Sequence, residues 1–129
     1  MRAITRRIAQ LCCLVALALP ACGGSDSGST GPGADNYLPV ISNFWQNVAT
    51  AGYNLTLQSA DDGKASGTFT GTERRAAVES VVTGSFTNSK ASFVIRRTGG
   101  TVTYNGTFYG AGKDSLRLTL GNETLIFRR

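Results

Sequence analysis

The chain has 129 residues, enough for one small domain, and a formal net charge of +5 at pH 7. Three positive charges, Arg2, Arg6 and Arg7, fall at the start of the chain, and from Cys22 onward ten Lys/Arg stand against eight Asp/Glu. These charges are scattered rather than gathered into a basic stripe with aromatic residues, which argues against a nucleic-acid-binding protein. The sequence has no histidine and no cysteine after Cys22, so the usual general bases and nucleophiles are missing. We therefore expect no enzymatic activity, no metal site and no cofactor.

Residues 1–21 have the pattern of a bacterial signal peptide. A positively charged start precedes an apolar stretch, residues 8–19, that is too short to span a bilayer comfortably. The stretch leads into Leu19-Pro20-Ala21-Cys22, which resembles the lipobox of bacterial lipoproteins. The resemblance implies that residues 1–21 are removed, that the Cys22 thiol receives a diacylglyceryl group, and that a further acyl chain such as palmitate is added to the new amino group. An ordinary secretory signal or an uncleaved anchor is the alternative.

Residues 22–36 comprise this cysteine and a Gly/Ser-rich linker without periodic apolar residues. Such a composition predicts a flexible tether with a root-mean-square reach of about 20 Å. The lipoprotein resemblance implies a protein held in the bacterial cell envelope by a lipid anchor at Cys22, with the membrane as its partner. Gly23 stands where an aspartate tends to retain lipoproteins in the inner membrane, so the resemblance also implies the periplasmic side of the outer membrane.

Residues 37–129 form the predicted folded domain, in which apolar and polar residues alternate with period two. This alternation predicts seven strands, at 53–58, 66–71, 78–86, 91–96, 102–108, 115–120 and 125–127, separated by turn signals. Residues 37–48 add an eighth strand or a short helical plug. For residues 72–81 we predict a loop running into a long strand, rather than a helical turn, because residues 78–82 are rich in β-branched side chains.

A weak repeat runs through three of these strands, as Gly67-Thr68-Phe69, Gly84-Ser85-Phe86 and Gly106-Thr107-Phe108. Glycine lets a strand bend sharply, and a neighbouring aromatic ring covers it. Curvature at several strands favours closure, which removes the two edges of an open sheet. The strands are short for a membrane-spanning barrel, and their aromatic residues lie mid-strand. The predicted fold is all-β, an antiparallel meander of seven or eight strands that closes into a small soluble β-barrel.

The order of features from Phe44 to Arg129 resembles small calycin-type barrels, the lipocalin and avidin-like group. A tryptophan, Trp45, stands near the start, and a strand with Leu-Thr-Leu, an Asp-Gly turn and Gly-Thr-Phe-Thr-Gly follow. The last strand ends in basic residues, and the resemblance implies that Arg128 or Arg129 packs on Trp45. A single tryptophan argues against biotin binding, because avidin-like proteins stack several around that ligand.

The inward side chains decide what such a barrel does. An eight-stranded barrel has an interior that is either filled by side chains or wide enough for one small ligand. A filled interior makes the protein a non-catalytic envelope scaffold or interaction module, and the alternative is lipocalin-like binding of a small hydrophobic ligand. The predicted inward residues are Leu55, Leu57, Phe69, Val82, Phe86, Phe93, Ile95, Val102, Tyr104, Phe108, Leu116, Leu118, Leu120, Leu125 and Phe127.

For the ligand-binding alternative, the candidate residues are Trp45, Phe69, Phe86, Phe93, Tyr104 and Phe108. Gly67, Gly84 and Gly106 would leave room beside them, and the Tyr104 hydroxyl would offer a polar handle. Trp45 fits a plug that closes one barrel end better than a ligand-stacking residue. Large inward side chains at both ends would indicate a filled core, whereas a polar residue deep inside would indicate a pocket.

Overall fold

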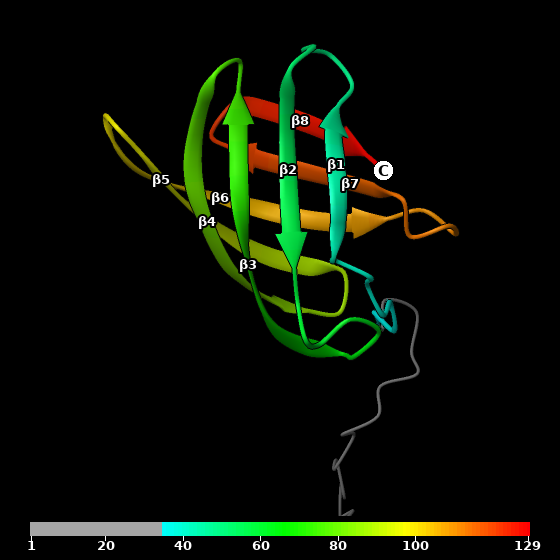
Figure 1. Ribbon diagram of the computed structural model, residues 1–129. Coiled ribbons are helices and arrows are strands. Elements are labelled where there is room, and N and C mark those ends of the chain that lie inside the picture. Colours follow the sequence, from blue (N-terminus) through cyan, green and yellow to red (C-terminus); the bar gives the residue numbers. More distant parts are fainter. Residues whose placement is uncertain (1–34) are drawn as a thin grey trace, which may run out of the picture. The chain divides into compact units, whose positions relative to one another are not determined.

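The computed structural model describes residues 35–129, so the predicted signal peptide, Cys22 and the linker up to residue 34 lie outside the described residues. The described part is all-β, as predicted, and no helix in it is long and apolar enough to cross a membrane. Eight strands follow one another along the chain (Figure 1): β1 (Asn43–Asn47), β2 (Tyr53–Gln58), β3 (Ser66–Arg75), β4 (Val78–Thr87), β5 (Lys90–Arg97), β6 (Gly100–Tyr109), β7 (Ser115–Leu120) and β8 (Glu123–Arg128).

Each strand pairs antiparallel with the next, and the sheet closes because β1 also pairs with β8. The closing seam places Gln46 opposite Arg128 and Asn47 opposite Phe127. A backbone hydrogen bond of 2.9 Å, from the Val48 N–H to the Ile126 carbonyl, extends this seam. The predicted meander and its closure are confirmed, with eight strands, and closure pairs the two strands that would be edges in an open sheet.

The eighth strand comes from residues 37–48, and the extended segment before it, residues 35–42, closes one end of the barrel without a helix. The backbone N–H groups of Ile41 and Ser42 donate to the Asp62 carboxylate, which belongs to the connection between β2 and β3. The Tyr37 hydroxyl donates to the Tyr109 carbonyl oxygen at 3.1 Å, at the end of β6. The segment is therefore fixed to two different hairpins of the barrel.

For residues 72–81 the sequence predicted a loop that runs into a long strand, and the predicted loop is wrong. Strand β3 continues to Arg75 because its residues pair with β2 on one side and with β4 on the other. Only Ala76 and Ala77 turn the chain, and Ala76 has a positive φ of 54°. Glycine or asparagine usually occupies such a position, so the sequence carries no turn signal there. The long strand that follows is confirmed as β4.

The apolar face of the meander points into the barrel, as predicted. The predicted inward residues are buried, except that Val102 and Leu125 are partly buried and Leu120 is 41% exposed. Leu120 ends β7 beside the turn at Gly121-Asn122, so its side chain stands at the rim. The buried apolar set also includes Ile41, Trp45 and Tyr53.

The room expected above two of the inward glycines is filled by phenylalanine rings. Gly84 on β4 lies between Phe69 on β3 and Phe93 on β5, and the centroids of these two rings are 4.6 Å apart. A Cβ atom at Gly84 would collide with the Phe69 ring and with the Ser92 carbonyl oxygen, and one at Gly106 would collide with the Phe93 ring. These glycines therefore make space for aromatic side chains of the core rather than for a ligand.

We predict that Gly84→Ala lowers the free energy of unfolding by about 1–3 kcal/mol, because the added methyl group overpacks the core and meets backbone as well as a ring. Urea unfolding followed by the fluorescence of Trp45, the only tryptophan, measures the change. Gly99→Ala is the matched control, since a Cβ there has open space and the change should stay within about 0.5 kcal/mol. Equal stability of the two variants would contradict the packing described above.

Candidate functional site: the barrel interior and its distal end

The two ends of the barrel carry different connections, as Figure 1 shows, and they also differ in chemistry. We call the end crossed by residues 35–42 the proximal end, and it also carries the connections 59–65, 88–89 and 110–114. The distal end carries the connections 48–52, 76–77, 98–99 and 121–122. The predicted aromatic residues fill the interior between these ends, and a group of charged and hydroxyl side chains lies towards the distal end.

All six candidate ligand-binding residues lie inside the barrel and are at least 97% buried: Trp45, Phe69, Phe86, Phe93, Tyr104 and Phe108. Four of their rings form a continuous row through the interior. Trp45 and Phe108 have centroids 5.8 Å apart, Phe108 and Phe93 6.1 Å, and Phe93 and Phe69 4.6 Å. The rings are tilted against one another, an arrangement that favours aromatic packing. The structure brings the predicted residues together, as neighbours in a packed core.

Trp45 lies at the proximal end, where it contacts the segment that closes the barrel. Its indole N–H donates to the Ile41 carbonyl oxygen at 2.9 Å. The Arg129 guanidinium lies over its ring, 5.4 Å from the centroid, so the expected packing of a terminal arginine on Trp45 is confirmed. Since Trp45 is fully buried and Phe108 covers another side of the ring, no free face remains for stacking a ligand.

A buried ion pair occupies the distal part of the interior. Glu73 on β3 is 1% exposed, and Arg97 on β5 holds its carboxylate with two hydrogen bonds. The Arg97 Nε donates to Glu73 Oε2 at 2.8 Å, and its Nη2 donates to Glu73 Oε1 at 2.6 Å. The Tyr53 hydroxyl on β2 donates to the same Oε1 at 2.7 Å. Both carboxylate oxygens are therefore engaged by groups of the barrel itself.

Tyr104 and Glu123 extend this arrangement to the rim. The Tyr104 hydroxyl accepts a hydrogen bond from Arg97 at 3.3 Å and donates to the Glu123 carboxylate at 2.9 Å. We call Tyr53, Glu73, Arg97, Tyr104 and Glu123 the distal cluster. It links five different strands, β2, β3, β5, β6 and β8, across one end of the barrel.

The pKa values of the distal cluster follow from this pairing. Burial alone would raise the pKa of Glu73, but the hydrogen bonds from Arg97 and Tyr53 and the nearby guanidinium charges outweigh it and hold the pKa below its usual range. The hydrogen bond to Glu73 raises the pKa of Arg97. Burial and the neighbouring carboxylate raise the pKa of Tyr53, and burial raises that of Tyr104. At neutral pH the cluster thus holds an ionised Glu73–Arg97 pair between two neutral tyrosines.

Neither Glu73 nor Arg97 is among the site residues predicted from the sequence, although the period of the strands carries a signal for both. Glu73 continues the inward run of Phe69 and Gly71, and Arg97 continues the run of Phe93 and Ile95. Charged residues near the ends of strands are usually solvated, so period alone does not identify a buried pair. The predicted polar handle, Tyr104, does lie inside, but its hydroxyl is engaged by Arg97 and Glu123.

Asn47 is a further polar side chain inside the barrel, at the end of β1. It is 4% exposed, and its Oδ1 accepts hydrogen bonds from the backbone N–H groups of Ala49 and Thr50, at 2.9 and 2.8 Å. These bonds shape the connection between β1 and β2. Its Nδ2 has no hydrogen-bond partner among the described residues.

No family model, no curated protein and no solved structure matches the chain. Within residues 35–129, no three acidic, cysteine or histidine side chains stand close enough together to hold a metal ion. What the barrel does must therefore be inferred from its own residues.

We predict that Glu73→Gln lowers the free energy of unfolding by about 3 kcal/mol. This value is near the lower end of the losses measured when a buried ion pair is broken, because about a fifth of the Arg97 side chain stays exposed to solvent. Because the pKa of Glu73 is lower in the folded chain than in the unfolded chain, its carboxylate stabilises the fold above the unfolded-state pKa, and this contribution is lost as the pH falls through the folded-state value. Urea unfolding between pH 7 and acid pH should thus show that the free energy of unfolding depends less steeply on pH for Glu73→Gln than for the wild-type protein.

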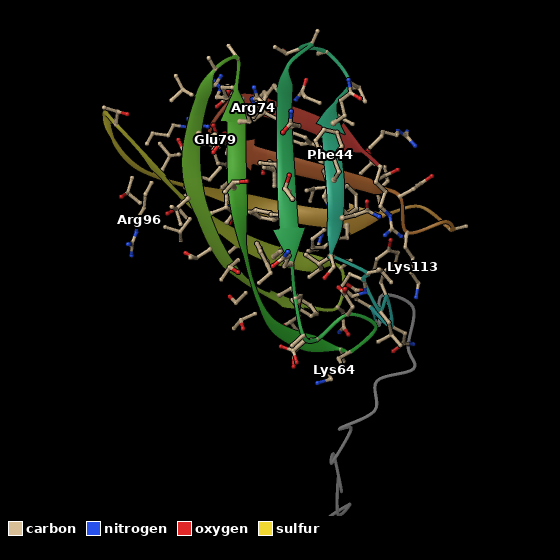
Figure 2. All side chains as sticks on the ribbon, viewed as in Figure 1. Phe44, Lys64, Arg74, Glu79, Arg96 and Lys113 are labelled. Atoms are coloured by element: carbon tan, nitrogen blue, oxygen red, sulfur yellow. The ribbon has the colours of Figure 1, made fainter. Side chains whose placement is uncertain are left out.

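The control for this experiment is Glu79→Gln, which neutralises an exposed carboxylate on the neighbouring strand, opposite Arg74 (Figure 2). It should change the stability by no more than about 0.5 kcal/mol. A parallel acid dependence for Glu73→Gln and the unmodified protein would show that Glu73 is not the titrating group.

Proposed function

We propose that this protein is a lipid-anchored lipoprotein of the bacterial cell envelope whose barrel acts as a non-catalytic scaffold or interaction module. The observation that carries the second part is the filled interior, in which Phe69 and Phe93 occupy the space beside Gly84. The proposed anchor rests on the lipobox-like Leu19-Pro20-Ala21-Cys22 and the Gly/Ser-rich residues that follow. The eight-stranded architecture, with Arg129 on Trp45, supports the resemblance to calycin-type barrels.

A module of this kind presents its outer face and its loops to partners. The outer face is rich in threonine and serine: Thr68, Ser85, Ser92, Asn105, Thr119 and Thr124 form one continuous row from β3 to β8. Exposed apolar side chains stand at the distal rim, where Val48, Val78 and Leu120 are 58%, 57% and 41% exposed. The proposed tether leads to the proximal end, which leaves the distal rim available on the far side of the barrel.

The second candidate is binding of a small ligand inside the barrel, and the distal cluster is the observation that favours it. A polar residue deep in a barrel is a usual feature of ligand pockets, and Glu73 is such a residue. Its carboxylate, however, already has Arg97 and Tyr53 as partners, and the Arg75 guanidinium lies 4.8 Å from the centroid of the Tyr53 ring. A ligand would have to displace these internal contacts, so we rank this function second.

The anchor is tested in bacteria that express the full-length protein and are grown with labelled palmitate. The mass of the N-terminal peptide of the purified protein is then measured. We expect label in the protein and a mature chain that begins with an acylated Cys22. Cys22→Ser should abolish the label, whereas the control Cys13→Ser should keep it, because Cys13 lies in the segment that is removed. An unmodified Cys22 peptide, or a different mature N-terminus, would refute the anchor.

The filled interior is tested on the full-length protein purified from membranes in detergent. Native mass spectrometry followed by denaturing extraction should detect covalent acyl chains and no stoichiometric non-covalent ligand. Addition of fatty acids or membrane extract should leave the emission of Trp45 unchanged, because its ring is enclosed by the core. A bound molecule released only on denaturation would favour the second candidate.

A further inference from the structure

A groove with partly apolar walls lies at the proximal end, outside the barrel interior. It has a volume of about 660 Å³ and runs between the segment that precedes β1 and the hairpin that joins β6 to β7. Its lining includes the apolar residues Leu38 and Ala111 and the tyrosines Tyr37 and Tyr109, and Lys113 adds a cation. Leu38 is 39% exposed, so part of this lining faces solvent.

Hydrogen bonds hold the two walls of this proximal groove in place. The Tyr37 hydroxyl donates to the carbonyl oxygens of Tyr109 and Gly110, at 3.1 and 3.3 Å, and so joins one wall to the other. The Asp35 carboxylate accepts hydrogen bonds from the hydroxyl and the N–H of Ser89, on the hairpin between β4 and β5. These hydrogen bonds tie the segment before β1 to two hairpins of the barrel, which favours a groove whose walls are already in place.

The charges on the proximal groove suit a ligand that carries both signs. Lys113 offers an ammonium group to an anion. Asp35 lies on the same groove, and although burial alone would raise its pKa, the hydrogen bonds from Ser89 and Tyr37 lower it, so the carboxylate is ionised at neutral pH. A zwitterionic phospholipid headgroup has a phosphate that could pair with Lys113 and an amine that could pair with Asp35. Its acyl chain matches the apolar wall.

The residues that begin the proximal groove follow the proposed anchor closely in the sequence. Asp35, which lines the groove, is 13 positions after Cys22, and a linker of this composition reaches about 20 Å. An anchor of that length holds the groove near the bilayer at a high effective concentration, so a contact too weak to retain free lipid becomes significant. Lys113 and Lys64 project from this end of the barrel in Figure 2, whereas Arg74 and Glu79 lie at the other end.

From these observations we propose that the proximal groove binds a phospholipid of the membrane that carries the anchor, with an acyl chain along Leu38 and Ala111 and the phosphate at Lys113. This inference rests on the proposed function for the location of the protein. It gives the barrel a fixed orientation, with the proximal end on the bilayer and the distal rim facing away from it.

The test is photo-crosslinking of the full-length protein in phosphatidylethanolamine vesicles. A benzoylphenylalanine placed at Leu38 should form phospholipid adducts, detected by mass spectrometry of the labelled peptide, and a second probe at Ala111 should do the same. The matched control is the same probe at Phe44, which is equally apolar, 50% exposed and does not line the groove (Figure 2). Lys113→Gln should reduce the adduct at position 38 about fivefold, whereas Arg96→Gln, on the opposite side of the barrel, should not.

Equal lipid adducts at Leu38 and Phe44 would overturn the proposal, because they would show contact with the bilayer without a groove. Adducts at Leu38 with residues 1–34 or with another protein would also overturn it, since they would identify a different occupant. The mass of the N-terminal peptide from the same sample reports the anchor independently. A missing acyl group would refute the proposed anchor, and the adducts would still decide whether the groove binds phospholipid.

Discussion

The interior of a closed eight-stranded barrel is narrow, so the strands that surround it limit the size of every side chain that points inward. Sharp bends in some strands favour the closure of eight short strands, and the enclosed space is then wide enough only for packed side chains or for one small ligand. At Gly84 side chains take this space, because the missing Cβ leaves the volume that Phe69 and Phe93 occupy from the adjacent strands. The arrangement works in only one register, since a shift of one residue would turn these rings outward.

The Glu73–Arg97 pair adds a polar constraint to this apolar one. Removing a carboxylate from water is costly, and only the two hydrogen bonds from Arg97 and the one from Tyr53 make the position of Glu73 tenable. The two partners belong to β3 and β5, which are separated by β4, so the pair joins strands that are not neighbours. The ion pair thereby links β3 and β5 at the distal end, in the same strand register that places Phe69 and Phe93 on either side of Gly84.

The two ends of the barrel thus have separate roles in the proposed function. The proximal end combines a segment fixed by Asp62 and Tyr109, the plugging Trp45 and a groove with apolar and charged walls. If the anchor and the lipid-binding groove proposed above are correct, these features place the proximal end at the membrane. The distal end has short connections and exposed valine and leucine side chains over a satisfied polar cluster, which suits contact with a protein partner. Between the two ends lies the buried aromatic and aliphatic core.

The all-β meander, the inward face of nearly every strand and the aromatic residues of the core could be predicted from the sequence, because period-two alternation and turn residues act locally. The sequence did not determine the hairpin at Ala76, where alanine adopts a backbone conformation that glycine usually signals. Nor did it show that rings fill the space beside Gly84, because this depends on which strands become neighbours. Tertiary structure alone decided that Glu73 meets Arg97, since burial of a charge at a strand end follows from closure of the barrel and not from the residues beside it in the chain.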